Sequence, residues 1–336
     1  MKLKCGRYFW AICFGILLTG FTVYAVLDIF VIQRAYKKNA TEINDAMFDV
    51  TPVVVASPTP SIPEPTKLPD VTPTLGPTST PTPTPTPSIF TEEEYVSDNY
   101  YSNDHLVVSM TDYRVCETNV HVGEIWVTSP RYILSAFAKD TYGMHINEKT
   151  TVLAKKKEAV LAINGDNYGQ RERGYVIRNG VTYRDKGDKV KDAMIFLANG
   201  DFLFTYGSNL TPLKDYVEMD AWHAFSFGPV LLDNGEIMVA KNYEIKDNYG
   251  SNPRTGIGMI EPNHYIFLVS DGRTSKNKGL SLYEMADFMK ELGCTKAFNL
   301  DGGGSSTMVF CGRVVNFPTT SGKYSERAVG DILYVR

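Results

Sequence analysis

A tract of alternating proline and threonine divides this chain into parts that cannot share one core. Twelve of the 18 prolines lie between Pro52 and Pro87. Such a segment buries too little apolar surface to fold and favours extended polyproline II. At about 3.1 Å per residue, the tract would hold a domain up to roughly 110 Å away. We therefore expect residues 39–91 to be a disordered linker, suited to reaching into a cell wall or to acting as a generic tether.

An apolar run lies N-terminal to this linker. Residues Tyr8 to Ile32 contain few polar breaks, and about 25 residues exceed the roughly 20 that a helix needs to cross a bilayer. Basic residues lie on both sides of the run: Lys2, Lys4 and Arg7 before it, and Arg34, Lys37 and Lys38 after it. The three that precede the run favour a cytoplasmic N-terminus. A signal peptide cleaved near Ala25 is the alternative, but the apolar run continues past that position. We predict an uncleaved signal anchor in residues 1–38, with the C-terminal domain outside the cell.

This topology predicts the outcome of proteolysis on intact cells or spheroplasts. Protease should release a fragment that begins within about residues 50–92, because exposed unfolded segments are cleaved first. N-terminal sequencing of the released fragment checks the result. A domain that is protected until the membrane is opened would reverse the predicted orientation.

The remaining segment, residues 92–336, is long enough to form one substantial core. The net charge of the chain is −4 and no Lys- or Arg-rich patch stands out in this segment, which argues against nucleic acid as a partner. Three of the five cysteines lie here, namely Cys116, Cys294 and Cys311, without C-x-x-C spacing. They form at most one internal disulfide, so the domain is neither a disulfide scaffold nor a zinc site.

Short apolar runs rich in β-branched and aromatic residues dominate this domain, such as residues 121–127 and 131–137. Asn-Gly between two such runs is the strongest local hairpin signal, because both residues tolerate positive φ. It occurs three times: at Asn179-Gly180, Asn199-Gly200 and Asn234-Gly235. We expect a fourth hairpin between Ile257 and Val269, around Pro262-Asn263.

Helices are fewer. Ser281 and Glu284 form a predicted capping box, an apolar face follows to Leu292, and Gly293 ends the helix. A second helix is expected near residues 148–157, ahead of a strand at 159–163. The mixture predicts a strand-rich α+β domain of mixed sheets with a few covering helices.

Polar residues cluster where the predicted strands end, in loops at 164–168, 252–256, 270–273 and 299–307. Taken singly, each loop is typical of an Asx-turn or a helix cap, but loops at strand ends also carry function. Together they contain two arginines, three aspartates and a glycine run: Arg254, Arg273, Asp166, Asp271, Asp301 and Gly302–Gly304. The N–H groups of the glycine run are suited to binding an oxyanion. Arginine binds phosphate through its bidentate fork, and carboxylates suit chemistry at an anomeric carbon. The loops therefore predict a site for an anion and a sugar.

Six motifs make residues 120–336 resemble the phosphodiester glycosidases, a family that includes the uncovering enzyme of the lysosomal pathway and bacterial exopolysaccharide-associated proteins. The motifs are Asn164-Gly165-Asp166, Phe227-Gly228-Pro229-Val230-Leu231, Arg254-Thr255-Gly256-Ile257-Gly258, Val269-Ser270-Asp271-Gly272-Arg273, Gly279-Leu280-Ser281-Leu282 and Asn299-Leu300-Asp301-Gly302-Gly303-Gly304-Ser305. The resemblance implies hydrolysis of a sugar-1-phosphodiester in a cell-envelope glycan or exopolysaccharide.

The same resemblance implies roles for the loop residues. Arg254 and Arg273, with the Gly302–Gly304 amides, would neutralise the leaving phosphate and so replace a strong general acid. Asp301 or Asp271 would be the nucleophile or base. The predicted substrate-binding residues are Asn164, Asp166, Asn299, Gly302, Gly303, Gly304 and Ser305.

Two other functions use the same residues. A transglycosylase would move the sugar to another hydroxyl at the same carbon, and a non-catalytic module would only bind the glycan. The expected partners are a glycan or sugar-phosphate substrate and a membrane, with no nucleic acid. No cofactor is expected, although Asp, Asn and carbonyl oxygens also suit Ca²⁺. We expect His223 and His264 to be structural.

Overall fold

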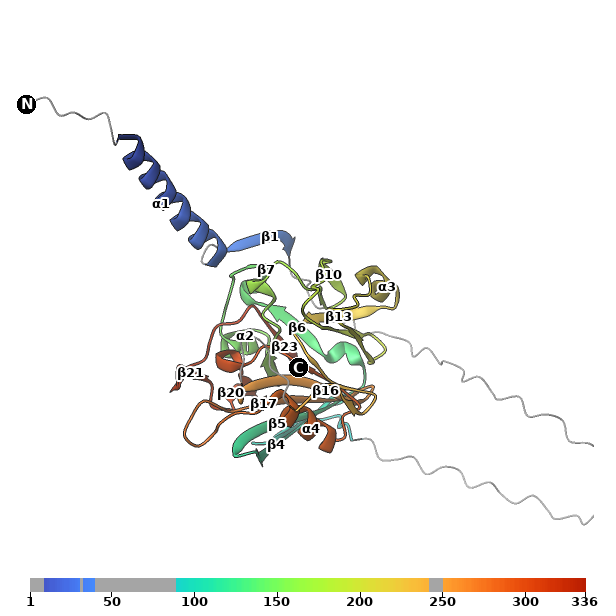
Figure 1. Cartoon of the computed structure of the whole chain (residues 1–336). Helices are drawn as coiled ribbons and strands as arrows, with labels where there is room; N and C mark the ends of the chain where they lie inside the picture. Colours follow the sequence, from blue (N-terminus) through green and yellow to red (C-terminus); the bar gives the residue numbers. More distant parts are fainter. Residues whose placement is uncertain (1–8, 31–32, 40–88, 242–249) are drawn as a thin grey trace, which may run out of the picture.

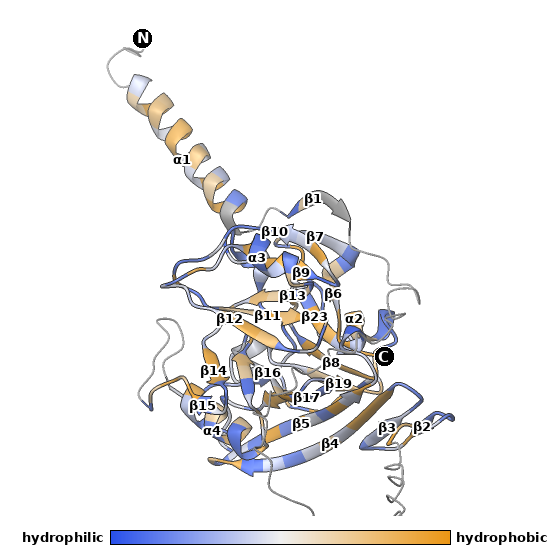
Figure 2. Cartoon of the chain, turned by 90° about the vertical axis from the view of Figure 1, so that its right-hand side faces the viewer, coloured by the Kyte–Doolittle hydropathy of each residue, from blue (hydrophilic) through white to orange (hydrophobic). Residues whose placement is uncertain are grey.

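The computed structural model describes residues 9–30, 33–39, 89–241 and 250–336, so the predicted linker lies almost entirely outside the described residues. Helix α1 (Phe9–Phe30) projects from the folded domain (Figure 1) and is apolar along most of its length (Figure 2). Its segment Trp10–Asp28 is long and apolar enough to cross a membrane. The predicted apolar helix is confirmed, and the same features fit a membrane anchor or a signal sequence.

Three sheets build the domain in the described part of the chain. The nine-stranded sheet has, in spatial order, β15 (Glu236–Ile237), β14 (Val230–Asp233), β18 (Lys296–Asn299), β16 (Arg254–Glu261), β17 (His264–Ser270), β5 (Thr118–Val127), β4 (Leu106–Val115), β3 (Tyr100–Ser102) and β2 (Tyr95–Val96). The β13 sheet has β10 (Val181–Arg184), β9 (Val176–Arg178), β13 (Ala221–Ser226), β11 (Ala193–Leu197) and β12 (Phe202–Thr205).

The β23 sheet has β20 (Arg313–Val314), β19 (Met308–Phe310), β8 (Leu161–Asn164), β23 (Asp331–Val335) and β6 (Leu134–Phe137). Two small pairs complete the described strands: β1 (Arg34–Asn39) with β7 (Thr141–Met144), and β21 (Thr319–Thr320) with β22 (Lys323–Tyr324). In the β23 sheet, the strand nearest the C-terminus lies between β8 and β6 and pairs with both.

One apolar core lies between these three sheets. It includes the fully buried residues Ile125 of β5, Phe225 of β13 and Leu333 of β23. Helices cover the outer faces: α4 (Leu282–Glu291) packs on the nine-stranded sheet through Met285 and Met289, α3 (Leu213–Glu218) packs on the β13 sheet, and α2 (Thr150–Lys156) contacts β8 and β23. This arrangement confirms the strand-rich α+β fold with a few covering helices.

The local sequence signals hold in the structure. All three Asn-Gly dipeptides turn between paired strands, and Asn263 (φ 73°) turns the fourth hairpin between β16 and β17. Both bonds of the capping box are present, with Glu284 N donating to Ser281 Oγ at 3.1 Å and Ser281 N donating to Glu284 Oε2 at 2.7 Å. Gly293 ends α4 with φ 90°.

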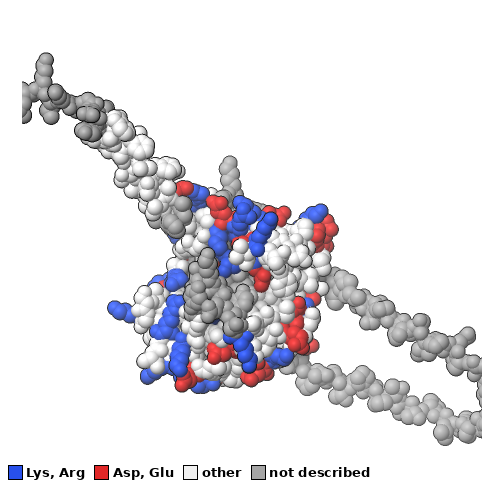
Figure 3. Space-filling model, viewed as in Figure 1, with Lys and Arg blue, Asp and Glu red and all other residues white. Residues whose placement is uncertain are grey.

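One expectation needs correction, and one helix was not expected. The strand predicted at 131–137 begins only at Leu134, because Pro130–Tyr132 form a 3₁₀ helix that the side chain of Ser129 caps. Helix α3 was not predicted, since its six residues are too few to display a helical period. The surface carries both signs of charge on the face shown in Figure 3, and the four described cysteines are free: Cys13, Cys116, Cys294 and Cys311.

Candidate active site

The polar loops predicted to form a site come together in the structure. The amide of Gly303, in the loop after β18, donates to the carbonyl of Pro253, just before β16, at 2.8 Å. The amide of Arg254, the first residue of β16, donates to the hydroxyl of Ser270, the last residue of β17, at 3.0 Å. Hydrogen bonds that two backbone amides donate therefore connect three of the four loops.

Asn164, the last residue of β8, connects the fourth loop to the others through hydrogen bonds of its side chain. Its Nδ2 donates to the carbonyl of Asp301 at 2.7 Å, and its Oδ1 accepts from Thr255 Oγ1 at 2.9 Å and from the amide of Thr307 at 3.3 Å. The side chain is fully buried. In this structure the predicted sugar-binding amide of Asn164 serves to fix the position of Asp301.

Asp301 is a half-buried carboxylate among polar and charged groups. Burial raises its pKa above the ordinary value for aspartate, and the negative charge of Asp166 adds to this rise. A hydrogen bond from the Ser305 hydroxyl and the positive charges of Arg327 and Arg171 act in the opposite direction. A carboxylate whose pKa is shifted by burial and by specific charged neighbours is a candidate reacting group.

The glycine run that follows Asp301 leaves room for two guanidinium groups. Gly303 has φ 65°, and a Cβ there would lie 3.2 Å from Nη2 of Arg273. A Cβ on Gly304 would lie 2.8 Å from Nη2 of Arg327. The Gly303 amide already donates to a backbone carbonyl. The glycines thus allow two arginines to lie against the loop, one on each neighbouring glycine.

Arg254 and Arg273, the two arginines predicted to bind phosphate, are neighbours with different surroundings. Arg254 is buried, and it donates through Nε to the carbonyl of Leu280 (2.9 Å) and through Nη2 to that of Gly250 (3.0 Å). Burial, together with the charge of Arg273, lowers the pKa of Arg254 to about 10. Arg273 is exposed and donates from Nε and Nη2 to Oδ1 of Asn252. Arg273 is therefore the more accessible of the two to a ligand.

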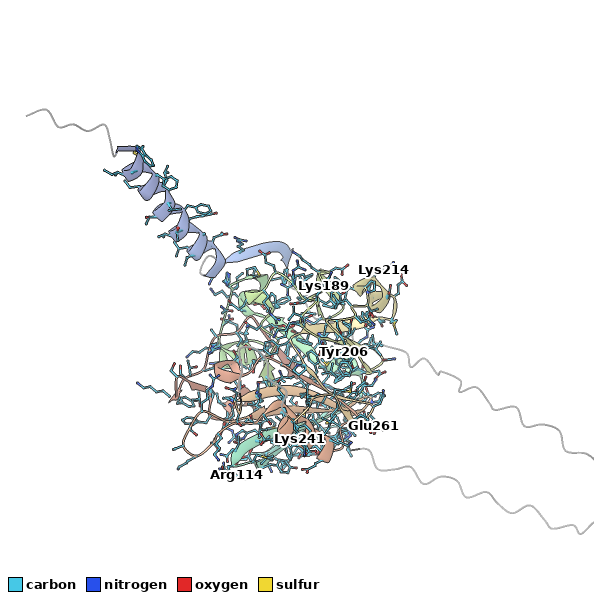
Figure 4. The ribbon with its side chains drawn as sticks, viewed as in Figure 1. Arg114, Lys189, Tyr206, Lys214, Lys241 and Glu261 are labelled. Atoms are coloured by element: carbon cyan, nitrogen blue, oxygen red, sulfur yellow. The ribbon has the colours of Figure 1, made fainter. Side chains whose placement is uncertain are left out.

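Asp271 is occupied by protein partners. Its Oδ1 accepts from the amide of Phe317 at 2.7 Å, and its Oδ2 accepts from Nδ2 of Asn277 at 3.2 Å. Nε2 of His121 lies 3.6 Å from Oδ1. Asn277 is itself held by Arg114, which Figure 4 labels beside β4. These contacts fix the loop that carries Arg273.

Asp166 and Asn299 are buried and bonded within the protein. Oδ1 of Asp166 lies 2.9 Å from Nη2 of Arg178, and the same nitrogen lies 2.7 Å from Oδ2 of Asp331. Asn299 donates through Nδ2 to the carbonyl of Gly228 at 2.7 Å. We call Asp166, Arg178 and Asp331 the buried cluster; at most 1% of each side chain is exposed.

Sequence reasoning missed two arginines of the site. Nη2 of Arg171 donates to the carbonyls of Asp166 (3.0 Å) and Ser226 (2.7 Å). The amide of Arg327 donates to the carbonyl of Gly304 at 3.2 Å. Arg171 lies only five positions after Asp166, so the first loop offered a weak signal. Arg327 has no glycine beside it, and only the tertiary fold brings it to the site.

The two histidines set aside from the sequence have structural contacts. His223 is fully buried between Ile133 O and Asn179 N, and burial lowers its pKa to about 3. Nε2 of His264 lies 2.8 Å from Glu124 Oε1. Within the described ranges, no three His, Cys, Asp or Glu side chains gather in a way that would hold a metal ion.

Comparison with known proteins agrees with the resemblance seen in the sequence. The model of the phosphodiester glycosidase family matches residues 157–336. The SPbeta prophage-derived uncharacterized protein YomE of Bacillus subtilis is 30% identical over 201 residues, which are 58% of this chain and 30% of that protein. Mouse N-acetylglucosamine-1-phosphodiester alpha-N-acetylglucosaminidase is 39% identical over 66 residues, which are 20% of this chain and 13% of that enzyme. The chain thus spans less than a third of either relative.

A solved structure shares the fold. It is the catalytic domain of the zebrafish N-acetylglucosamine-1-phosphodiester alpha-N-acetylglucosaminidase, auto-inhibited by its pro-peptide. The TM-score is 0.55 and the identity is 21%, with 69% of this chain and 82% of that chain covered.

Proposed function

Because the chain belongs to the phosphodiester glycosidase family, we propose that it hydrolyses the bond between the anomeric carbon of a sugar and an oxygen of a phosphodiester. The observation that carries the proposal is Asp301, a half-buried carboxylate with a raised pKa beside Ser305, Arg171 and Arg327. The arginines against the glycine loop supply positive charge where a phosphate would leave. The names of the mouse and zebrafish enzymes describe the same type of bond.

In this proposal Asp301 is the nucleophile or the base. As the base, Asp301 takes a proton from the water whose oxygen bonds to the anomeric carbon, while the bond from that carbon to the phosphate oxygen breaks and a phosphomonoester leaves. As the nucleophile, Asp301 itself bonds to that carbon as the phosphomonoester leaves, and water then releases the sugar and regenerates the carboxylate, its proton passing to solvent. Arg273 and Arg327 stabilise the charge on the leaving phosphate. We assign Asp301 rather than Asp271 to this role, because both oxygens of Asp271 already accept hydrogen bonds from the protein. Arg254, Asn164, Asp166 and Asn299 hold the loops in place.

We place the reaction outside the cell, on a cell-envelope glycan or an exopolysaccharide. Helix α1 is long and apolar enough to anchor the chain in a membrane. In sequence, the proline-rich linker at 39–91 lies between this anchor, residues 1–38, and a catalytic domain at 92–336, whereas β1, just before the linker, pairs with β7 of that domain.

Product analysis tests the proposed reaction. The full chain in detergent is given a synthetic sugar-1-phosphodiester together with an acceptor glycan. Free sugar supports hydrolysis. Sugar transferred to the acceptor would make the protein a transglycosylase, and an unchanged substrate that binds would make it a glycan-binding module.

Arg273→Lys tests recognition of the phosphate. Inorganic phosphate should compete with the substrate, and competition should weaken as ionic strength rises because salt screens the charges. We expect the lysine variant to lose about tenfold in kcat/KM, equivalent to about 1.4 kcal/mol, because lysine lacks the planar fork. Arg313→Lys is the matched control, since Arg313 is exposed and contacts Asp98. Full activity in the Arg273 variant would make this side chain structural.

The pH dependence of the rate tests the pairing of Asp301 with Arg327. If Asp301 reacts as a carboxylate, kcat/KM should fall as pH drops through its pKa, which burial raises above the ordinary value. Arg327 lowers that pKa, so Arg327→Gln should move the acid limb of the profile to higher pH. Arg313→Gln should leave the limb in place. An acid limb at the same pH in the Arg327 variant would show that Arg327 does not act on the pKa of Asp301.

A further inference from the structure

We infer that Arg171 contacts the substrate, donating its free Nη1 nitrogen to an anionic oxygen of the phosphodiester, and that the buried cluster holds it in place. The inference rests on the proposed function for the identity of the anion. No sequence motif that suggested the site includes this arginine.

The two ends of the guanidinium group of Arg171 differ. Nη2 donates to two backbone carbonyls, those of Asp166 and Ser226. Nη1 is buried, and no acceptor in the described residues lies within hydrogen-bond reach of it. A buried donor without an acceptor is rare in native proteins. In a site that also holds Asp301, such a donor points to a ligand oxygen as its partner.

The acceptors of Nη2 do not neutralise the charge of Arg171, because they are carbonyl oxygens rather than carboxylates. The aromatic ring of Phe227 lies beside the group, with 5.3 Å between the Cζ atom and the ring centre. The nearby carboxylate that feels its charge is Asp301, whose pKa Arg171 lowers. No carboxylate of the described residues lies within ion-pair distance of Arg171, so an anion that binds next to Asp301 gains both the free donor and a positive charge without an ion-pair partner.

The buried cluster sets the position of these acceptors. Oδ2 of Asp166 accepts from the amide of Ser226 at 2.6 Å, so one residue fixes both carbonyls that hold Arg171. Oδ1 of Asp166 accepts from Nη2 of Arg178 at 2.9 Å, and Nε of Arg178 donates to Oδ2 of Asp331 at 2.8 Å. This network joins the loop after β8 to the ends of β9, β13 and β23. Residues of both the β13 sheet and the β23 sheet therefore hold the carbonyls that Arg171 contacts.

Two variants of the full chain test the inference: Arg171→Met and Arg171→Lys. The binding readout is the affinity for inorganic phosphate, measured by calorimetry, and the kinetic readout is kcat/KM on the sugar-1-phosphodiester. We expect the methionine variant to bind phosphate at least tenfold more weakly and to lose about 100-fold in kcat/KM. Because it also loses two hydrogen bonds to carbonyls, both values are corrected for the folded fraction, which the melting temperature of the same preparation gives. The lysine variant should recover only part of both, because one amine cannot reach two carbonyls and the ligand.

Arg131→Met is the matched control. Arg131 also lies against an aromatic ring, that of Trp222 at 5.0 Å, and also has a buried nitrogen without a partner. It differs in having a carboxylate partner, Asp220, at 2.9 Å. We expect this variant to keep both the phosphate affinity and the rate.

The two readouts separate the inference from the proposed function. A wild-type chain that binds phosphate but releases no sugar would overturn the proposed reaction, while the phosphate affinity of Arg171→Met would still decide the role of Arg171. An active wild type with unchanged affinity and rate in Arg171→Met would overturn the inference. Equal losses of phosphate affinity in the Arg171 and Arg131 variants would also overturn the inference, because they would reflect the net charge of the protein and not a contact of Arg171 with the ligand.

Discussion

Asp301→Asn should remove at least about 10³-fold of the turnover of a sugar-1-phosphodiester, equivalent to about 4 kcal/mol of transition-state stabilisation. The amide has nearly the same shape as the carboxylate but neither attacks the anomeric carbon nor accepts a proton from water. The fold should be retained. Because burial raises the pKa of Asp301, its ionised form destabilises the folded state at neutral pH, and the neutral amide should keep or raise the melting temperature.

Asp271→Asn is the comparison that makes this result informative. The carboxylate of Asp271 accepts hydrogen bonds from the Phe317 amide and from Asn277. Its loss should lower stability by about 1–3 kcal/mol, with the rate falling in proportion to the unfolded fraction. Measuring kcat and melting temperature on the same preparations separates the two residues. A folded but inactive Asp271 variant beside an active Asp301 variant would transfer the reacting role to Asp271.

Arg178→Leu should strongly destabilise the domain. It leaves the carboxylates of Asp166 and Asp331 facing each other in the interior without their shared cation. Breaking a buried ion pair in this way costs about 3–5 kcal/mol. Urea unfolding of the full chain, followed by tryptophan fluorescence, measures the loss.

The pH dependence of this loss identifies its cause. Burial already raises the pKa of Asp331, and the charge of Arg178 opposes that rise. Without Arg178 the folded-state pKa is higher still, so the carboxyl group binds its proton in the folded state more tightly than in the unfolded state. The variant should therefore be least impaired at low pH and lose stability as pH rises. Arg178→Leu combined with Asp331→Asn should recover part of the loss; a pH-independent cost without recovery would indicate lost packing instead.

Local signals account for the parts of the fold that were predicted from the sequence. Asn179-Gly180 forms its turn because both residues take positive φ within the dipeptide itself. The capping box of Ser281 and Glu284 likewise spans only four residues. The glycine loop was recognisable because Gly302–Gly304 are consecutive. In each case the interacting groups lie close together in the sequence.

The parts of the candidate site that were not predicted depend on contacts between residues far apart in the sequence. Arg178 and Asp331 are 153 positions apart and meet because the β13 sheet, which contains β9, and the β23 sheet pack on one core. Nothing in the neighbourhood of Asp331 suggests a partner, since it begins an ordinary apolar strand. Asp271 illustrates the opposite case: its motif is typical of a site, but its oxygens are used by the protein. Sequence pattern located the loops, whereas side-chain geometry was needed to assign their residues.

The position of β23 has a consequence for how the protein is made. This strand lies between β8 and β6 and brings Asp331 into the buried cluster. Its neighbours, residues 134–137 and 161–164, leave the ribosome about 170–200 residues earlier. Until residues 331–335 emerge, β8 and β6 have no strand between them, and Arg178 lacks one of its two carboxylates. The buried cluster that supports the candidate site is therefore completed only when β23 emerges, so a product terminated just before residue 331 should lack the proposed activity.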